Sequence, residues 1–359
     1  MLSVELRKQL RDYELEVAFE VAPARCHVLI GPTACGKTMT LRMIAGLEQP
    51  DAGRVVLNGR PLFDAARGVA LPPERRSVGF VFQSYALFPH LSIVDNVAYG
   101  LRARGRGARE ARARAREILE RVHLQGLEQE RPGRLSGGQQ QRVAVARAIA
   151  GSAEVLLLDE PMAALDTQTR RRMRDELKSV IDGLDVATVV VTHDPVDALT
   201  LGQVISVMQE GRLCQTDTRQ ELLARPRNEY VAEFLGLNLL RGEAHTDASG
   251  LTEVRCGEQR FYSLHPASGP VFLTCHPSDI ILSRERPEGS ALNVLRGRVV
   301  SLSRLGAATR VALLPQGSST TNGSTLVAEI SHLSEQELSL HEQDEVYAAF
   351  KASATEVYS

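Results

Sequence analysis

The sequence has little of several features that would each indicate a particular class of protein. Its 359 residues carry 42 Lys and Arg against 44 Asp and Glu, a formal net charge of −2. No overall basic field therefore argues for a nucleic-acid partner. The chain also lacks any apolar run of about 18 residues, the length that a membrane-spanning helix needs. We expect that the chain does not cross a membrane and that it serves one, if at all, from the surface.

Cysteines are few, and they are scattered without the spacing of a metal site or a disulfide framework. Their odd number and wide spread predict reduced thiols and a cytosolic setting, and they are Cys26, Cys35, Cys214, Cys256 and Cys275. The N-terminal stretch MLSVELRKQLRDYELEV alternates apolar and charged residues and lacks the apolar core of a signal peptide. With 43% hydrophobic and 24% charged residues, the composition is that of an ordinary soluble protein, and the length predicts more than one domain.

Residues 1–235 predict an α/β domain with a parallel sheet at its centre. Apolar runs without polar alternation are typical of strands that are buried on both faces of such a sheet. They occur at residues 26–31, 77–82, 154–159 and 187–193. Helical patterns lie between them, at residues 37–49, 137–151 and 167–183. A helical subdomain is expected within about residues 84–150.

Residues 236–359 differ in texture and predict a small all-β domain, a barrel or a sandwich. Short apolar segments alternate with turn signals such as PQGSSTTNGS and HEQDE. The predicted strands cover residues 271–276, 296–303, 309–315, 325–331 and 345–353.

The stretch RARGRGAREARARARE, residues 102–117, is rich in arginine and alanine. A nucleic-acid-binding arm would have a similar composition. However, no aromatic residues are interleaved to stack on bases, and Glu110 and Glu117 dilute the charge. We interpret the stretch as a solvated turn and an amphipathic helix.

The stretch GPTACGKT, residues 31–38, has the form G-x-x-x-x-G-K-[ST] and lies between a predicted strand and a predicted helix. In such a phosphate-binding loop, backbone N–H groups at the start of the helix point at phosphate oxygens. Lys37 is expected to reach the β and γ phosphates, and the Thr38 hydroxyl to bind Mg²⁺. The predicted ATP contacts are Gly31, Pro32, Thr33, Ala34, Cys35, Gly36, Lys37, Thr38 and Met39.

Two residues of this loop differ from its commonest form. Ala34 stands where glycine is frequent, which is tolerable if the residue keeps a negative φ. Cys35 lies near the start of a helix, where a thiol is expected to have a lowered pKa. Alkylation of Cys35 is therefore expected to block ATP binding.

The apolar run VLLL, residues 155–158, is followed by two acids. Asp159 is placed to hold Mg²⁺ directly or through water. Glu160 is placed beyond the γ phosphate, where it can orient or deprotonate the attacking water. Two unrelated surface acids are the alternative, but the buried strand before them favours a functional pair.

A second phosphate-binding element is predicted in RLSGGQQQR, residues 134–142. Ser136, Gly137 and Gly138 precede a predicted helix that begins near Gln139, again a helix N-terminus suited to phosphate. One chain then offers two such elements for one nucleotide. A head-to-tail homodimer explains both, because the serine-glycine element of each chain can close on the ATP that the other chain holds.

In the order of these motifs, residues 1–235 resemble the ATP-binding-cassette (ABC) ATPases. GPTACGKT resembles the Walker A loop, RLSGGQQQR the signature and LLLDEP the Walker B strand. The resemblance further implies a glutamine loop in residues 81–101 with Gln83 as its glutamine and Mg²⁺ contact. It also implies a D-loop in AALD with Asp166 at the nucleotide and a switch histidine, His193, near the γ phosphate. Tyr13 resembles the aromatic residue that stacks on adenine; an ordinary strand tyrosine is the alternative.

The family resemblance implies that two cassettes close on two ATP molecules and reopen after hydrolysis, with Lys37, Gln83, Glu160 and His193 in catalysis. The segment SYALFPHLSI would expose Tyr85, Phe88 and Pro89 to a transmembrane permease. The implied setting is the cytoplasmic face of the membrane, with an external solute-binding protein as an indirect partner and no nucleic acid.

Residues 236–359 resemble the TOBE or Mop-type appendage of importer ATPases, a small OB-like fold. The stretches 289–299 and 348–357 resemble the two ends of the oxyanion-binding module of molybdate proteins. Ser290, Lys351 and Ser353 could supply hydroxyls and a cation to a tetrahedral oxyanion; a purely structural role is the alternative. The stretches 57–83 and 234–244 resemble importers of molybdate or tungstate. Sulfate, ferric-iron, polyamine and sugar importers share the layout, with sulfate as the next candidate.

Two other classes of protein are rival interpretations. A soluble ABC ATPase that acts on nucleic acid or ribosomes usually carries two cassettes or long coiled coils, and neither is present. An oxyanion sensor with a secondary cassette would not need the full catalytic set Lys37, Asp159, Glu160 and His193.

Overall fold

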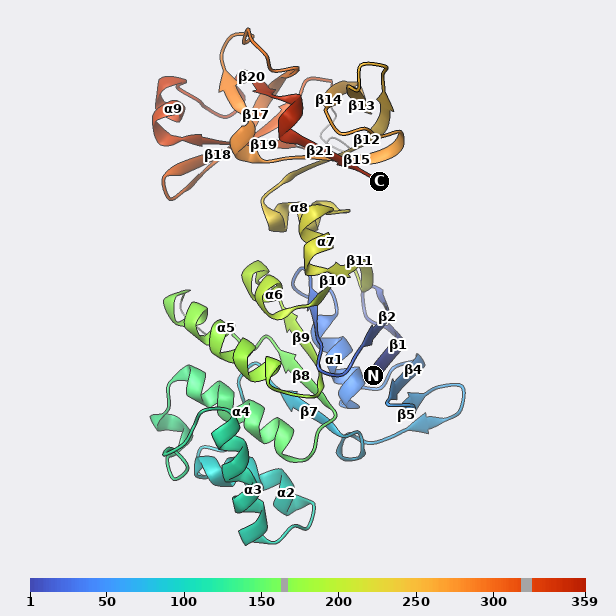
Figure 1. Cartoon of the computed structure of the whole chain (residues 1–359), viewed down its shortest axis with the longest axis vertical. Coiled ribbons are helices and arrows are strands. Elements are labelled where there is room, and N and C mark those ends of the chain that lie inside the picture. The colour runs from blue at the N-terminus through green and yellow to red at the C-terminus, as the bar shows by residue number, and fades with distance from the viewer. Residues whose placement is uncertain (163–166, 318–324) are drawn as a thin grey trace. The chain divides into compact units, whose positions relative to one another are not determined.

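The computed structural model describes residues 1–162, 167–317 and 325–359 (Figure 1). It divides into two compact units, Met1–Leu222 and Leu223–Ser359. The sequence predicted a boundary at residues 235 and 236, so the structure assigns the intervening segment to the second unit.

The first unit is built on one eleven-stranded sheet. From one edge to the other, its strands are β6 (Val69–Ala70), β5 (Arg60–Asp64), β4 (Ala52–Leu57), β1 (Leu2–Gln9), β2 (Glu14–Val21), β11 (Arg212–Thr218), β10 (Val204–Gln209), β3 (Cys26–Ile30), β9 (Ala187–Thr192), β8 (Val155–Asp159) and β7 (Val78–Val81).

One half of this sheet is parallel and carries the predicted central strands. β10, β3, β9, β8 and β7 pair in parallel along this order. Every residue of β3, β8 and β9 is buried, as expected for strands covered on both faces. The four predicted strands correspond to β3, β7, β8 and β9 to within a residue or two at their ends.

The other half of the sheet is antiparallel except where β2 meets β11, and it was not predicted as a set of strands. β1 pairs with β2 and β4 in antiparallel register, and buried residues alternate with more exposed ones along β1 and β2. This alternation places one face on the core and leaves the other face more exposed. The buried face shares a core with α1 (Lys37–Ala45) through Leu6, Leu15 and Leu41.

The first helix ends earlier than the sequence predicted. Gly46, at φ 78°, ends α1 in the left-handed conformation that glycine adopts without steric cost. The Arg76 side chain then donates from Nη1 to the carbonyls of Met43 and Ile44 at 2.8 and 3.0 Å. This buried guanidinium stabilises the carbonyl end of the helix, where the helix dipole favours positive charge.

The remaining helices of the first unit are α2 (Ile93–Ala103), α3 (Ala108–Arg121), α4 (Gly137–Ala150), α5 (Thr167–Asp182) and α6 (Pro195–Leu201). The three helices α2, α3 and α4 fall within the predicted helical subdomain and lie together in Figure 1. The arginine-rich stretch forms α3, whose Ala111 and Ala115 are buried while Arg109 and Arg116 are exposed. The interpretation as an amphipathic helix agrees with this structure.

The second unit contains two five-stranded antiparallel sheets, which agrees with the predicted all-β, OB-like domain. The first sheet is β14 (Gln259–Ser263), β13 (Thr252–Cys256), β12 (Asn238–Thr246), β15 (Gly269–Cys275) and β21 (Thr355–Tyr358). The second is β16 (Ile281–Ser283), β20 (Glu345–Phe350), β17 (Asn293–Leu305), β18 (Ala308–Pro315) and β19 (Leu326–Ser331). Its helices are α8 (Glu229–Leu235) and α9 (His332–Glu337), and α7 (Arg219–Ala224) spans the boundary.

A buried asparagine joins the two sheets of this unit. Asn238 of β12 accepts a hydrogen bond from the Val327 amide of β19 at 2.7 Å and donates to the Val327 carbonyl at 2.9 Å. This side chain therefore satisfies both backbone groups of one residue on the neighbouring sheet. Within the described residues of both units, no helix combines the length and apolar composition needed to span a membrane.

We predict that a buried histidine makes the stability of the first unit depend on pH. His27 of β3 is buried, and burial lowers its pKa to about 4, from 6.5 when solvated. The unfolded chain therefore binds a proton that the folded chain excludes between these values. The contribution of neutral His27 to the free energy of unfolding is fully present above pH 6.5. It falls by roughly 3 kcal/mol as the pH drops to 4.

The measurement is the urea midpoint for loss of ATP binding between pH 7.5 and pH 5. His27→Gln, which removes the titrating group, should flatten this dependence. An equal pH dependence in the variant and the parent would contradict the prediction.

Candidate active site

The candidate site lies where three parallel strands end side by side. In the sheet, Ile30 at the end of β3 pairs with Thr192 of β9, and Asp159 at the end of β8 pairs with Val191. The loop 31–36 follows β3, Glu160 follows β8 and His193 follows β9. Carboxyl ends of parallel strands meet at one edge of a sheet, which is the usual position of a ligand site in such folds.

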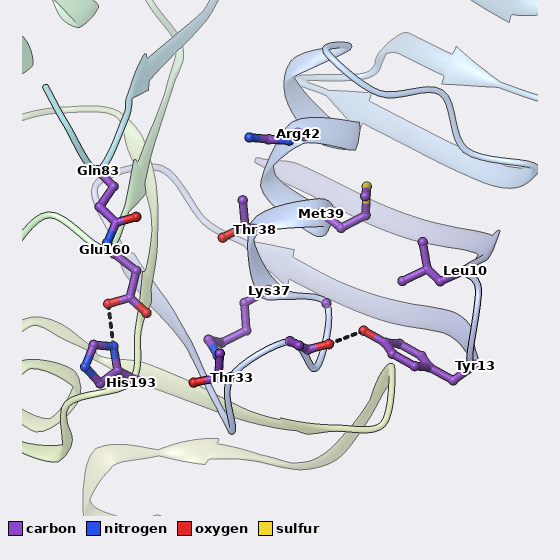
Figure 2. Close-up of a pocket in the computed structure, with 12 residues that line it drawn as sticks. Leu10, Tyr13, Thr33, Lys37, Thr38, Met39, Arg42, Gln83, Glu160 and His193 are labelled. Atoms are coloured by element: carbon purple, nitrogen blue, oxygen red, sulfur yellow. Dashed lines mark hydrogen bonds and ion pairs between the residues drawn. The ribbon is translucent and has the colours of Figure 1, made fainter. Parts of the chain in front are cut away.

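A cavity of about 510 Å³ opens at this edge (Figure 2). Its walls bring together most of the predicted nucleotide residues, from five separate parts of the chain. They are Tyr13, Thr33, Ala34, Gly36, Lys37, Thr38, Met39, Gln83, Glu160 and His193. Leu10 and Arg42 also line the cavity and were not predicted. Arg42 could have been found from its spacing, because it lies four residues after Thr38 on the same face of α1.

The Lys37 ammonium is buried within the loop that precedes it. Its Nζ donates to the carbonyls of Gly31 and Pro32 at 2.8 and 2.7 Å. These two bonds orient the cation at the base of the cavity, where it can meet phosphate oxygens.

A hydroxyl and a carboxylate meet directly beside Lys37. Thr38 Oγ1 donates to Asp159 Oδ1 at 2.7 Å. Burial raises the pKa of Asp159, and the Thr38 hydrogen bond and the charges of Arg42 and Lys37 partly offset that shift. A desolvated carboxylate beside a hydroxyl is the oxygen donor set that a magnesium ion binds together with substrate phosphates.

Glu160 and His193 form a second pair across the cavity (Figure 2). His193 Nδ1 donates to Glu160 Oε2 at 2.8 Å. Glu160 has a φ of 46°, a left-handed conformation that is uncommon outside glycine. Such strain at a residue that lines a cavity is typical of functional positions.

The structure overturns the expectation for Ala34. The residue has a φ of 64°, in the left-handed region, rather than the negative φ that would make alanine comfortable there. A Cβ in this region approaches the backbone and costs roughly 1–2 kcal/mol. The loop therefore needs the conformation that glycine provides, and this chain adopts it with alanine.

The expectation of a lowered pKa for Cys35 is also wrong. The Cys35 side chain is buried, and burial raises the pKa of its thiol. The Lys37 Nζ, 3.8 Å from Sγ, opposes this shift without reversing it. Cys35 does not line this cavity, and it contributes with Glu210 and Arg212 to the wall of a neighbouring pocket.

Tyr13 lines the edge of the cavity, and its hydroxyl donates to the Ala34 carbonyl. A Cβ at Gly211 would come within 2.6 Å of this ring, so the β10–β11 turn packs directly against it. The ring is therefore held beside the phosphate-binding loop. The structure is compatible with stacking on a base, which remains a prediction.

Comparisons with known proteins identify this architecture. Residues 15–163 match the family model described as ABC transporter, and residues 289–357 match the TOBE domain. The molybdate/tungstate import ATP-binding protein WtpC of Pyrococcus horikoshii is 37% identical over 361 residues, covering 100% of both chains. The chain belongs to the ATP-binding subunits of ABC importers.

Other importer subunits are also similar to this one. The spermidine/putrescine import ATP-binding protein PotA of Frankia alni is 41% identical, with 88% of this chain and 71% of the relative covered. The sulfate/thiosulfate import ATP-binding protein CysA 2 of Chromobacterium violaceum is 44% identical, with 80% and 76% covered. The solved dimeric structure of the bacterial ABC transporter cassette MJ0796 is 29% identical at a TM-score of 0.50, covering 61% of this chain and 99% of that one.

The signature segment of this importer subunit lies apart from the cavity lining. Ser136 caps α4, because its Oγ accepts from the Gln139 amide at 3.3 Å while Gln139 Oε1 accepts from the Ser136 amide at 2.9 Å. Gly137 and Gly138 form the first turn of the helix. A helix N-terminus with exposed Ser136 is therefore available to a second molecule. The D-loop residue Asp166 lies outside the described residues.

The predicted permease-facing segment is only partly exposed. Tyr85 is buried, and its hydroxyl donates to the Pro161 carbonyl at 2.9 Å, so the expectation that this side chain faces a partner is wrong. Phe88 is half-buried against Tyr99, with ring centroids 4.5 Å apart, and Pro89 is exposed. Tyr99, which is 50% exposed, extends this surface and was not predicted.

The three residues predicted for an oxyanion lie on the surface of the second unit. Ser290, Lys351 and Ser353 are all exposed. Lys351 and Ser353 flank Ala352, which is buried in a short 3₁₀ turn between β20 and β21. Their role stays a prediction.

We predict that Ala34→Gly stabilises the cassette. The variant removes the left-handed alanine, and the greater flexibility of glycine in the unfolded chain cancels part of the gain, leaving roughly 0.5–1 kcal/mol. The measurement is the urea midpoint for loss of ATP binding. Ala52→Gly, in strand β4, is the control and should destabilise. A lower urea midpoint for Ala34→Gly than for the parent protein would contradict the inferred backbone strain at Ala34.

Proposed function

We propose that this chain is the ATP-hydrolysing subunit of an importer for molybdate or tungstate. The observation that supports this substrate is the full-length match to the molybdate/tungstate subunit of Pyrococcus horikoshii. The spermidine and sulfate relatives are more identical in sequence, but they match over 71% and 76% of their own lengths. A match over the full length includes the second unit as well as the cassette. We therefore give the coverage of the alignment more weight than its percentage identity.

In the proposed mechanism Glu160 is the general base. Its carboxylate lies in the cavity opposite Lys37 and accepts a hydrogen bond from His193. That bond fixes the direction of the carboxylate and leaves its second oxygen for a water molecule. His193, whose side chain is 53% exposed, can meet the γ phosphate from the open side. Lys37 neutralises the charge that develops on the phosphate oxygens.

Thr38, Asp159 and Gln83 are the residues that would hold magnesium. The Thr38 and Asp159 side chains already meet, and Gln83 lines the same cavity. These residues would hold the ion, which would supply positive charge to the phosphate oxygens. No group of three or more His, Cys, Asp or Glu side chains forms a metal cage in the described residues. This suits magnesium, which binds through few protein ligands together with substrate phosphates and water.

The proposed working unit is a homodimer at the cytoplasmic face of the membrane. Ser136, Gly137, Gly138 and Gln139 of each copy would close on the ATP of the other, as the exposed start of α4 allows. Phe88, Pro89 and Tyr99 would contact the permease, which in turn receives substrate from an external solute-binding protein. The second unit would have a regulatory role and bind internal oxyanion.

We predict that Glu160→Gln binds ATP normally and hardly hydrolyses it. The amide keeps the size of the side chain but cannot accept a proton, and a general base typically contributes roughly 10²–10⁴-fold. The measurement is the steady-state ATPase rate together with ATP affinity. Glu154→Gln, at the opposite end of the same strand, is the matched control and should retain activity. Near-normal turnover in Glu160→Gln would exclude the proposed role.

We also predict that the full-length chain binds molybdate and tungstate more tightly than sulfate. Isothermal titration with each oxyanion, and competition between them, measures this preference directly. Lys351→Gln should weaken binding if that cation contacts the oxyanion, whereas Lys178→Gln, on α5 of the first unit, should not. Preferential binding of sulfate would favour a sulfate importer instead, the alternative that the sulfate/thiosulfate relative of Chromobacterium violaceum supports.

A further inference from the structure

The position of His193 depends on a cluster of charges outside the cavity. The side chain of His193 is more than half exposed, and it donates a hydrogen bond to Glu160. Its place must therefore be set by the backbone on either side, at Thr192 and Asp194. Thr192 ends the buried strand β9, whereas Asp194 begins the short helix α6.

Asp194 is held through both carboxylate oxygens and its amide. Oδ1 accepts from the Asp197 amide at 2.9 Å, which caps α6, and the Asp194 amide donates to Thr192 Oγ1 at 3.1 Å. The second oxygen, Oδ2, accepts from Arg170 Nη1 of α5 at 2.9 Å. The residue next to His193 is thus fixed to another helix as well as to its own.

A second arginine of α5 completes this cluster. Arg174 Nη2 lies 2.6 Å from Asp197 Oδ1 and 3.7 Å from Asp194 Oδ1. Arg174 and Asp197 are 9% and 3% exposed, so this pair is shielded from solvent and is stronger than a surface ion pair. Burial raises the pKa of Asp197, and the hydrogen bond from Arg174 opposes that shift.

Helix α5 is itself fixed on its other side, to the signature helix. A Cβ at Gly138 would come within 3.1 Å of the Met173 side chain, so α4 and α5 approach closely at the first turn of α4. Arg142 of α4 also pairs with Glu176 of α5 at 3.5 Å. Arginines 170 and 174 therefore tie the backbone beside His193 to a helix that packs on the signature segment.

We infer that Arg170 and Arg174 are positioning residues that hold His193 against Glu160 by fixing Asp194 and Asp197 to α5. The inference rests on the proposed roles of Glu160 and His193 in hydrolysis. Neither arginine lines the nucleotide cavity, so their removal should affect turnover rather than nucleotide binding.

The test is Arg170→Gln in the full-length chain, assayed for ATP affinity, kcat and thermal stability. Arg170 is the better target because Arg174→Gln would leave Asp197 buried without its partner and could prevent folding. We expect kcat to fall about tenfold, as misplacement of a catalytic group does, with ATP affinity unchanged. Arg170→Lys keeps the positive charge and should restore most of the lost rate.

Arg171→Gln is the matched control, since it removes an exposed arginine from the adjacent position of α5 and should leave kcat unchanged. A double-mutant cycle with His193→Ala, in which ATP hydrolysis is measured over long incubations, supplies the decisive result. If Arg170 acts through His193, Arg170→Gln should cause little further loss in the His193→Ala background.

An unchanged kcat in Arg170→Gln, or an equal fold loss with and without His193, would overturn the inference. Failure of the proposed function would give a different result from failure of this inference. If the proposed function were wrong, Glu160→Gln and His193→Ala would themselves retain normal turnover.

Discussion

Parallel pairing of β3, β9 and β8 is the constraint on which the site depends. The register that places Ile30 beside Thr192 and Asp159 beside Val191 also places the loops that follow these strands side by side. Lys37, Glu160 and His193, which are far apart in the sequence, therefore meet in one cavity. The strands hold this register because they are fully buried, and an unpaired backbone group there would lack any other hydrogen-bond partner.

The loops at this edge have unusual backbone conformations that the rigid sheet supports. Ala34, Tyr85, Ala86 and Glu160 all have positive φ although none is glycine. Strained residues persist only where surrounding structure determines their conformation. Here the buried Tyr85 hydroxyl bonds to Pro161, and Arg147 donates to the carbonyls of Tyr85 and Ala86 at 2.8 and 2.7 Å. The glutamine-loop segment and the turn after β8 are thus held together from outside the cavity.

Charge beyond the cavity has a comparable role in shaping it. Arg76 stabilises the end of α1, the helix whose start lines the cavity with Lys37 and Thr38, and Arg170 of α5 pairs with Asp194 beside His193. Arg76 meets the carbonyl end of its helix, where the helix dipole favours positive charge, whereas Arg170 and Arg174 pair with the carboxylates of Asp194 and Asp197 at the start of α6. The nucleotide site of this importer subunit therefore relies on cations that never line it.

Much of the cassette could be predicted from the sequence by itself. Residues 31–38 and 154–160 each carry a local pattern whose chemistry needs no distant partner, and they predicted the nucleotide cavity and two of the buried strands, whereas residues 134–142 do not line that cavity. Tertiary structure alone decided the rest. The pairing of β1 with β4, the positive φ of Ala34, the burial of Cys35 and Tyr85, and the link from Arg170 to Asp194 all arise from contacts between distant segments. Local patterns record only the chemistry of neighbouring residues, whereas burial, strain and ion pairing depend on which segments the fold brings together.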